Sequence, residues 1–200
     1  MKTINAVIEC QIEQKKLNLD ASTRKNLIRI IRECGDEQNH CTNIKANMTN
    51  WAIQNQHQEF KELTLIAEAL AYDISPAPNL KLTSRDCWGA LYKQGEETVE
   101  HVHWGSLWSW CYYLKIPDGA SPLRLHNIDN KPMDIYPEED DFLIFNSWIK
   151  HSVPPLEVDD ERIVVAGNVM HDINLTNHYD LDAMVSMGEM FKNMMRKYHA

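Results

Sequence analysis

The chain has 200 residues, of which 44% are hydrophobic and 24% charged, and its formal net charge is −9. This composition is typical of one globular domain and excludes collagen-like and low-complexity classes, since glycine and proline number only 7 and 8. The acidic balance disfavours binding to free nucleic acid or to an anionic membrane. No apolar run is long enough to span a bilayer, and the first ten residues lack a signal-peptide pattern. We therefore expect a soluble, cytoplasmic, single-domain protein.

Residues 1–79 are expected to form a helical support. Residues 20–35 carry apolar side chains at helical spacing, with Asp20 or Ser22 as the N-cap and Gly35 as the stop. A second amphipathic helix is predicted over about residues 57–72, and the proline-rich segment that follows ends it. Amphipathic helices usually cover a hydrophobic core, so we assign this region to the scaffold.

Residues 80–172 have a different residue pattern, in which short runs of aromatic and β-branched residues are separated by turn-forming residues. The predicted strands are residues 85–93, 99–103, 108–116, 123–128, 141–146 and 162–170. Short strands at nearly even spacing favour a sandwich or barrel over a sheet with helical crossovers. Residues 173–200 return to a helical pattern that carries five methionines. This predicted C-terminal helix is expected to pack on the body or to form a homodimer contact.

Three of the nine histidines stand where they could share a metal ion. His101 and His103 are separated by one residue on a predicted strand, so both rings should point to the same face. His151 follows another predicted strand and a short turn that could return it to the same pocket. Arg162 opens an apolar strand, and a buried arginine requires an anion because an unpaired buried charge is costly. A structural ion pair with Asp140, Asp141 or Asp160 is the alternative role for this arginine.

Four sequence features, taken in chain order, resemble those of the Fe(II)/2-oxoglutarate-dependent oxygenases. They are H-V-H at residues 101–103, C-Y-Y-L at 111–114, D-F-L-I-F at 141–145 leading to His151, and Arg162. The order is similar to the prolyl-hydroxylase-like branch, and closer to a group of H-x-H oxygenases, many of them phage-encoded. The resemblance covers roughly residues 80–172. It implies a mainly β fold with flanking helices, a double-stranded β-helix or jelly-roll barrel that holds Fe(II) near its open end.

The resemblance also implies roles for individual residues. His101, His103 and His151 would be the metal ligands, although position 103 usually carries Asp or Glu in this family. The common set of two histidines and one carboxylate leaves iron open for 2-oxoglutarate and O₂. A third neutral ligand would leave the iron about one charge more positive, and it also makes a three-histidine zinc site conceivable.

The co-substrate pocket is implied to involve Arg162, Tyr113 and Tyr92. Arg162 would pair with the distal carboxylate of 2-oxoglutarate, Tyr113 would hydrogen-bond the same carboxylate, and Tyr92 would line the pocket. Strand alternation agrees with this set, because Tyr113 shares a face with Ser109 and Cys111 while the intervening tryptophans face outward under the helices. His126 and Asn168 are further polar residues that could support the site from behind.

The activity implied is hydroxylation of an unidentified substrate with release of succinate and CO₂. That substrate could be a protein or peptide side chain or a small molecule. Two other functions stay open at this point: a three-histidine metal-dependent hydrolase or isomerase of the cupin type, and a non-catalytic jelly-roll module. The first has no reason to bury Arg162 and Tyr113, and the second predicts no bound metal.

Overall fold

The computed structural model describes residues 10–36, 42–75, 81–126 and 131–172. The predicted C-terminal helix lies outside these residues. The elements in chain order are β1 (Ile12–Lys16), α1 (Ala21–Cys34), β2 (Ile44–Lys45), β3 (Asn47–Met48), the 3-10 helix η2 (Ile53–Asn55), α2 (Gln58–Ile74), β4 (Leu82–Tyr92), β5 (Glu97–His101), β6 (Trp108–Lys115), β7 (Leu123–His126), β8 (Pro132–Ile135), β9 (Asp141–Asn146), β10 (Lys150–Val153) and β11 (Arg162–His171). No helix among the described residues is long and apolar enough to cross a membrane.

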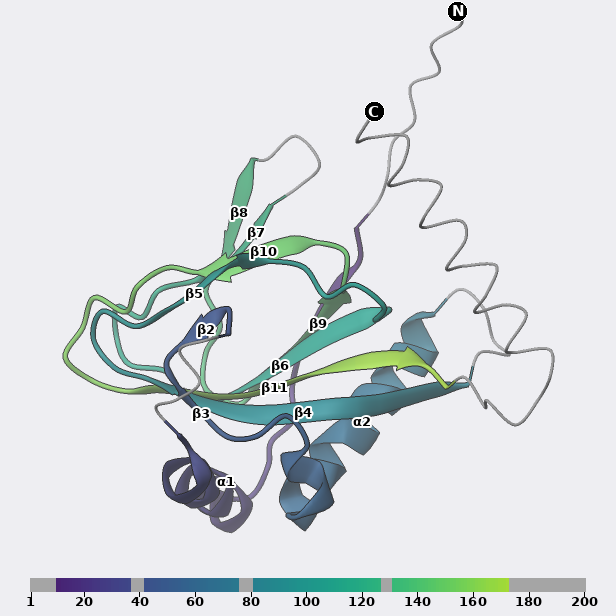
Figure 1. Cartoon of the computed structure of the whole chain (residues 1–200), viewed down its shortest axis with the longest axis horizontal. Helices are drawn as coiled ribbons and strands as arrows, with labels where there is room; N and C mark the ends of the chain where they lie inside the picture. Colours follow the sequence, from purple (N-terminus) through teal and green to yellow (C-terminus); the bar gives the residue numbers. More distant parts are fainter. Residues whose placement is uncertain (1–9, 37–41, 76–80, 127–130, 173–200) are drawn as a thin grey trace, which may run out of the picture.

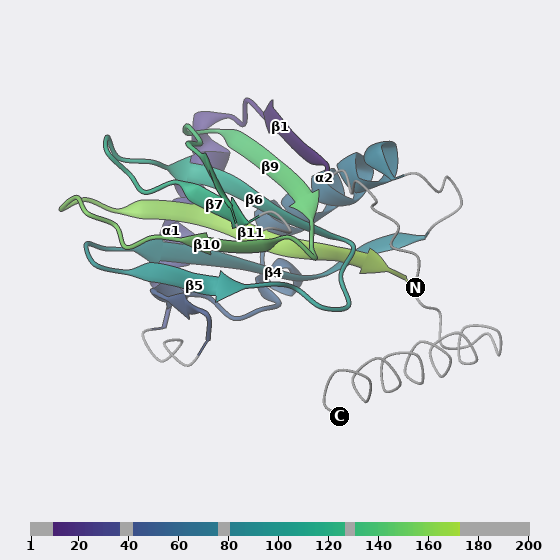
Figure 2. The ribbon, with the colours of Figure 1, turned by 90° about the horizontal axis from the view of Figure 1, so that it is seen from above.

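The strands form two antiparallel sheets that face each other in a jelly-roll arrangement. The larger sheet has the order β1-β9-β6-β11-β4-β3, and the smaller one has the order β2-β5-β10-β7-β8. Helices α1 and α2 lie on the outer side of the larger sheet, and the smaller sheet lies on its other side (Figure 1). From above, β5, β10 and β7 lie over the strands of the larger sheet (Figure 2). The mainly β fold with flanking helices is therefore confirmed.

Two hydrophobic layers stabilise this arrangement, and strand β6 contributes to both. Trp110 and Tyr112 are buried with the residues of α1 and α2, between the helices and the larger sheet. Tyr113 is buried with residues of the smaller sheet, and Cys111 packs against the same cluster between the two sheets. Successive side chains of a strand point to opposite faces, so the predicted alternation along β6 is confirmed.

Helix α1 approaches strand β4 closely at Gly89. A Cβ atom at this position would lie 2.2 Å from Cγ1 of Ile31. Replacing Gly89 with alanine is therefore expected to lower the free energy of unfolding by about 1–3 kcal/mol, because helix and sheet must move apart. Chemical denaturation measures the change, and an Ile31→Ala background is the control. If the close approach of Ile31 is the cause, Gly89→Ala lowers the free energy of unfolding much less in the Ile31→Ala background than in wild type. Equal losses of stability in the two backgrounds would contradict this explanation.

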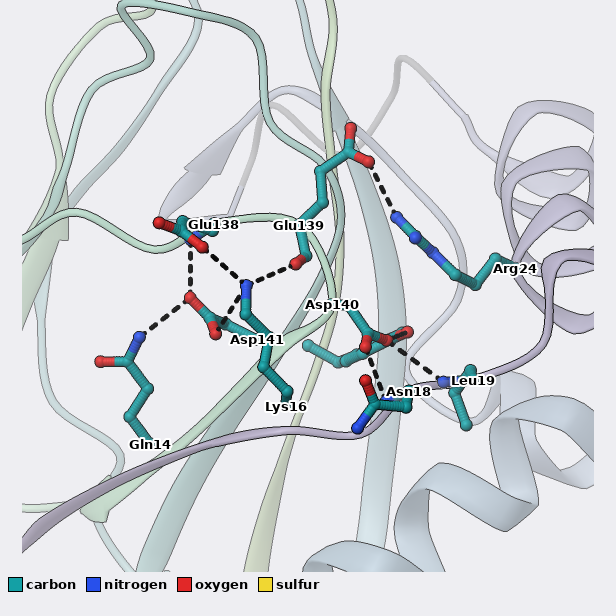
Figure 3. A network of polar contacts seen from close by, with 10 residues as sticks. Gln14, Lys16, Asn18, Leu19, Arg24, Glu138, Glu139, Asp140 and Asp141 are labelled. Atoms are coloured by element: carbon teal, nitrogen blue, oxygen red, sulfur yellow. Dashed lines mark hydrogen bonds and ion pairs between the residues drawn. The ribbon is translucent and has the colours of Figure 1, made fainter.

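The region expected to be a helical support also supplies three short strands. Strand β1 pairs with β9 at the edge of the larger sheet, and polar contacts fix it there (Figure 3). Lys16 Nζ lies 3.0 Å from Glu138 Oε2 and 3.2 Å from Asp141 Oδ1. The Asp140 carboxylate accepts a 2.6 Å hydrogen bond from the Asn18 backbone N–H. Strands β2 and β3 add to the edges of the smaller and larger sheet, respectively.

Candidate metal centre

The predicted site residues surround one cavity between the two sheets. His101 and His151 line it from strands β5 and β10 of the smaller sheet, and Tyr113 and Arg162 line it from β6 and β11 of the larger sheet. Tyr92, at the end of β4, also lines the cavity. Residues that lie far apart in the sequence thus meet in one interior space.

Backbone carbonyl groups hold the rings of His101 and His151 in a defined state. The two residues are partners in the β5–β10 pairing. Nδ1 of His101 donates to the carbonyl oxygen of Val99, and Nδ1 of His151 donates to that of Ile149, each over 2.8 Å. A carbonyl oxygen can only accept, so each Nδ1 carries the proton and each Nε2 keeps a lone pair. Metal-ligating histidines are oriented in this way.

His103 reaches the cavity from a loop, because strand β5 ends at His101. Its backbone N–H donates to the carbonyl oxygen of Ser147 over 3.1 Å, which ties this loop to the turn before His151. Its Nε2 lies 3.1 Å from Nε2 of His101. The expectation that both histidines lie on one strand is therefore wrong, although the structure still brings their rings together.

The three histidines form a group that could hold one metal ion. Their ligand atoms all lie within 4.8 Å of one another, and no carboxylate belongs to this group among the described residues. Adjacent ligands about 2.1 Å from a common metal are roughly 3 Å apart, which matches the spacing between His101 and His103. The donor set consists of three imidazoles, a set that suits iron, nickel, zinc and copper.

Burial keeps these histidines neutral. Desolvation, with a smaller effect of His101, lowers the pKa of His103 to about 4. Desolvation and the neighbouring histidines lower the pKa of His151 to about 3. The pKa of His101 is lowered as well, again mainly by desolvation. A neutral imidazole is the form that binds metal, so no proton has to leave these rings at neutral pH.

The metal-free protein is expected to lose stability as the pH falls from about 6.5 toward 4. Unfolded histidines have a pKa near 6.5, whereas His103 titrates lower when folded, so the unfolded state binds more protons in this window. Urea denaturation of chelator-treated protein at pH 7.5 and 5.0 measures the loss. It should be smaller for His103→Gln. Equal losses in wild type and His103→Gln would contradict this account.

Arg162 is a buried cation without a carboxylate partner among the described residues. Only 2% of the residue is exposed, and its Nη1 donates to the carbonyl oxygen of Ser121 over 3.0 Å. The guanidinium carbon lies 5.7 Å from the ring centroid of Tyr92 and 5.4 Å from that of Tyr113. Arg162 Nε and the Tyr113 hydroxyl are both buried without an oxygen or nitrogen partner, and the polar neighbour of the hydroxyl is the Cys111 thiol. Buried groups of this kind are satisfied by a polar ligand or by water that enters the cavity.

The proposed structural ion pairs of Arg162 are not formed. All three aspartates considered from the sequence interact with other side chains: Asp140 with Tyr112, Asp141 with Lys16, and Asp160 with Lys115. The arginine is therefore available for an anion that enters the cavity.

Tyr92 lies where the sequence predicts, but its hydroxyl is already engaged. It is 2.8 Å from Oγ1 of Thr98, a residue that also lines the cavity. Burial raises the pKa of Tyr92 to about 12, so the phenol stays protonated. The ring of Tyr92 thus shapes the cavity and contacts Arg162, whereas the free hydroxyl next to the arginine is that of Tyr113.

A chain of polar side chains supports the loop that carries His103. Asp86 accepts from the side-chain amide of Asn168 over 3.1 Å, and the amide oxygen accepts from Ser109 over 2.8 Å. The Ser109 hydroxyl is 3.0 Å from that of Ser147, whose carbonyl holds His103. An ionised carboxylate only accepts, so Asp86 fixes the orientation of the amide.

Only part of this support is predictable from the sequence. Asn168 was expected behind the site because it shares a face of its strand with Arg162, and it does lie there. Asp86 and Ser147 gave no signal, since a lone polar residue near a strand end has no diagnostic spacing. His126 does not support the cavity: its Nε2 lies 3.2 Å from the Glu100 carboxylate, and it is not among the lining residues.

A scan against protein-family models and a search of curated proteins each give no match. Several solved structures do match. A prolyl-4-hydroxylase from Pseudomonas putida aligns with a TM-score of 0.63 at 19% identity, covering 80% of this chain and 92% of that one. The viral collagen prolyl hydroxylase of Paramecium bursaria Chlorella virus-1, as its 2-oxoglutarate complex, gives 0.58 at 14% identity, covering 79% and 94%.

A third similar structure is HygX from Streptomyces hygroscopicus with nickel, 2-oxoglutarate and hygromycin B bound. It aligns with a TM-score of 0.62 at 9% identity, covering 80% of this chain and 83% of that one. At these identities the likeness establishes the fold that the chain shares with these proteins.

Proposed function

We propose that the protein is an oxygenase that depends on Fe(II) and 2-oxoglutarate. The observation that carries this proposal is a buried, unpaired arginine beside an unpartnered tyrosine hydroxyl, in the same cavity as a three-histidine group. A metal alone would explain the histidines but not Arg162 and Tyr113. A ligand that binds the metal at one end and presents a carboxylate at the other satisfies both halves of the cavity.

The residues fit a divalent transition metal at one end of the cavity. His101 and His151 present Nε2 lone pairs that their backbone hydrogen bonds hold in place, and His103 adds a third imidazole. Three protein ligands leave coordination positions open for exogenous ligands. When bound, iron supplies the oxidising chemistry by which O₂ converts 2-oxoglutarate to succinate and CO₂ and a substrate C–H bond is hydroxylated.

The other end of the cavity fits the distal carboxylate of 2-oxoglutarate. Arg162 provides the positive charge, and the Tyr113 hydroxyl provides a further donor, whose polar neighbour is the Cys111 thiol, a weak acceptor. The rings of Tyr92 and Tyr113 contact the guanidinium and restrict its orientation. Charge-assisted hydrogen bonds of this kind are about twice as strong as neutral ones.

The cavity that would receive 2-oxoglutarate is narrow, with a volume of about 60 Å³. The lining is mostly apolar, with Leu123, Phe145, Val153 and Val164 between the polar ends. These side chains exclude water from the site when the ligand fills it, and they hold its carbon chain between arginine and metal.

The substrate class is the finer part of the proposal. Among the similar structures, a prolyl hydroxylase from Trichoplax adhaerens is in complex with a peptide fragment and HygX is bound to hygromycin B, so proteins of this fold accept both peptides and small molecules. A protein or peptide side chain and a small molecule are therefore both candidate substrates here. A homodimer through the C-terminal segment is a further proposal that involves residues outside the described ones.

A three-histidine hydrolase or isomerase is the second candidate, favoured by the absence of a carboxylate from the group of metal-ligating residues in the described chain. It gives no role to Arg162 and Tyr113, so we rank it lower. A non-catalytic jelly-roll module gives no role to either end of the cavity.

Oxygen-dependent succinate formation tests the proposal. Protein loaded anaerobically with Fe(II) is mixed with 2-oxoglutarate and exposed to O₂, and succinate is measured by NMR. We expect succinate above a protein-free Fe(II) control and none from the zinc-loaded protein, since zinc has no redox chemistry. No succinate, together with no binding of 2-oxoglutarate to either metal form, would overturn the assignment in favour of the alternatives.

A further inference from the structure

One short turn between β9 and β10, residues 147–149, fixes two of the three histidines. The Ser147 carbonyl accepts from the backbone N–H of His103 over 3.1 Å, and the Ser147 N–H donates to the carbonyl oxygen of Leu107 over 3.0 Å. Two residues further along, the Ile149 carbonyl accepts from Nδ1 of His151 over 2.8 Å. The position of this turn therefore sets the place of His103 and the ring orientation of His151 together.

The turn is attached through Ser147 to the middle of the larger sheet. The Ser147 hydroxyl lies 3.0 Å from that of Ser109 on β6, and the Ser109 hydroxyl donates to the side-chain oxygen of Asn168 on β11 over 2.8 Å. All three residues are buried. A buried polar group that loses its partner is costly, so each of these side chains is held in one orientation. Buried side chains, and not the backbone alone, thus connect the turn to the two central strands.

An irregularity in the larger sheet aims Asn168 and Asp86 at each other. The pairing of β11 with β4 shifts its register between Asn168 and Val169, which leaves Arg85 as the extra residue on β4. Bulges of this kind often redirect a side chain beside a functional site. Asp86 Oδ1 accepts from the Asn168 backbone N–H over 2.8 Å, and both carboxylate oxygens lie 3.1 Å from the side-chain nitrogen. The carboxylate therefore turns the amide nitrogen toward itself and the amide oxygen toward Ser109.

Resting on the metal centre of the proposed function, we propose that Asn168, held by Asp86, is a positioning residue that sets how tightly the histidines bind metal. Asn168 is not among the described residues that line the cavity. It acts through the two serines on the turn that holds His103 and His151. Residues that only orient a metal ligand are typically worth 10–100-fold in metal affinity. Two ligands depend on this one turn, so loosening it weakens both.

Metal affinity measured without turnover tests this proposal. The full-length protein, free of metal, is titrated with Co(II) in competition with a coloured chelator, as wild type, Asn168→Ala and Ser109→Ala. We expect Asn168→Ala to lower the affinity about tenfold or more and to shift the visible bands of bound Co(II), because the ligands are held less firmly. The double variant should bind within about twofold of Asn168→Ala alone, since both changes interrupt the same chain.

Leu27→Ala is the control for an effect of stability alone. Leu27 is fully buried between the helices and the larger sheet, so its truncation destabilises the fold without touching the chain from Asp86 to Ser147. It should leave the metal affinity of the folded protein unchanged. If Asn168→Ala also lowers only the stability in urea and keeps the metal affinity, its role is structural and the proposal is overturned. Additive losses of affinity in the double variant overturn the chain of action.

A second variant covers the case in which Asn168→Ala does not fold. Ser147→Ala removes the hydroxyl and keeps the carbonyl that holds His103, and we expect the same loss of Co(II) affinity from it; wild-type affinity would overturn the proposal. The titration contains no 2-oxoglutarate, so such a result leaves the proposed function standing. If wild type binds Co(II) but calorimetry shows no binding of 2-oxoglutarate, the proposed function fails and the metal titration still decides the positioning role. If wild type binds no metal, both fail.

Discussion

Replacing Arg162 with alanine is expected to weaken binding of 2-oxoglutarate by between thirtyfold and several thousandfold. Removing one partner of a buried, hydrogen-bonded charge pair costs about 2–5 kcal/mol, and each 1.4 kcal/mol is about tenfold in affinity. The residue is fully enclosed and has no carboxylate partner among the described residues, so the anion has no substitute for it. Calorimetric titration of the zinc-loaded protein measures the effect without turnover.

Two variants serve as controls for the Arg162→Ala result. Arg162→Lys keeps the charge but loses the planar pair of donors, so it should bind with intermediate affinity. Arg124→Ala removes an arginine that pairs with Asp134 at the surface of the smaller sheet, and it should bind as wild type does. A Kd for Arg162→Ala within threefold of wild type would show that the arginine does not hold the co-substrate.

The second large effect is expected at His103. His103→Ala should lower metal affinity by more than about a hundredfold, since even residues that only orient a ligand are worth 10–100-fold. His103→Asp should retain the metal, because it restores two histidines with one carboxylate and places a negative charge beside the cation. Metal content after dialysis and competition with a chelator measure both. His126→Ala removes a histidine outside the cavity and should leave the metal content unchanged.

Full metal occupancy in His103→Ala would remove His103 from the ligand set. The site would then have two histidines and an open edge. Loss of metal from both His103→Ala and His103→Asp would instead mean that position 103 accepts only an imidazole.

Most strands that were predicted from the sequence have a buried face, although β10, with two buried residues, was not predicted. Strands β4, β6, β9 and β11 are rich in aromatic and β-branched residues, and each lies inside the larger sheet. Strands β1 and β8 were not predicted: four of the five residues of β1 and three of the four of β8 are exposed. Such edge strands are held by backbone pairing and polar contacts, which leave no hydrophobic period to detect.

The candidate site was predicted in its members but not in its geometry. The sequence placed His101 and His103 on one strand, whereas β5 ends at His101 and a loop brings His103 back. The sequence alone does not show whether Arg162 forms an ion pair with an aspartate. That outcome depends on whether the aspartates interact instead with lysines and a tyrosine that are distant in the sequence. The sequence also could not assign the Tyr92 hydroxyl to Thr98, six residues further along.

The most direct test of the account is whether 2-oxoglutarate binds to the metal at the histidine group. Under anaerobic conditions, Fe(II) chelated by 2-oxoglutarate gives a weak charge-transfer band in the visible region. We expect this band in wild type only when both Fe(II) and 2-oxoglutarate are present, and we expect its loss in His151→Ala and a large shift to higher 2-oxoglutarate concentration in Arg162→Ala. If wild-type protein shown to contain Fe(II) gives no band at saturating 2-oxoglutarate, the cavity does not bring co-substrate and metal together, and the central claim is contradicted.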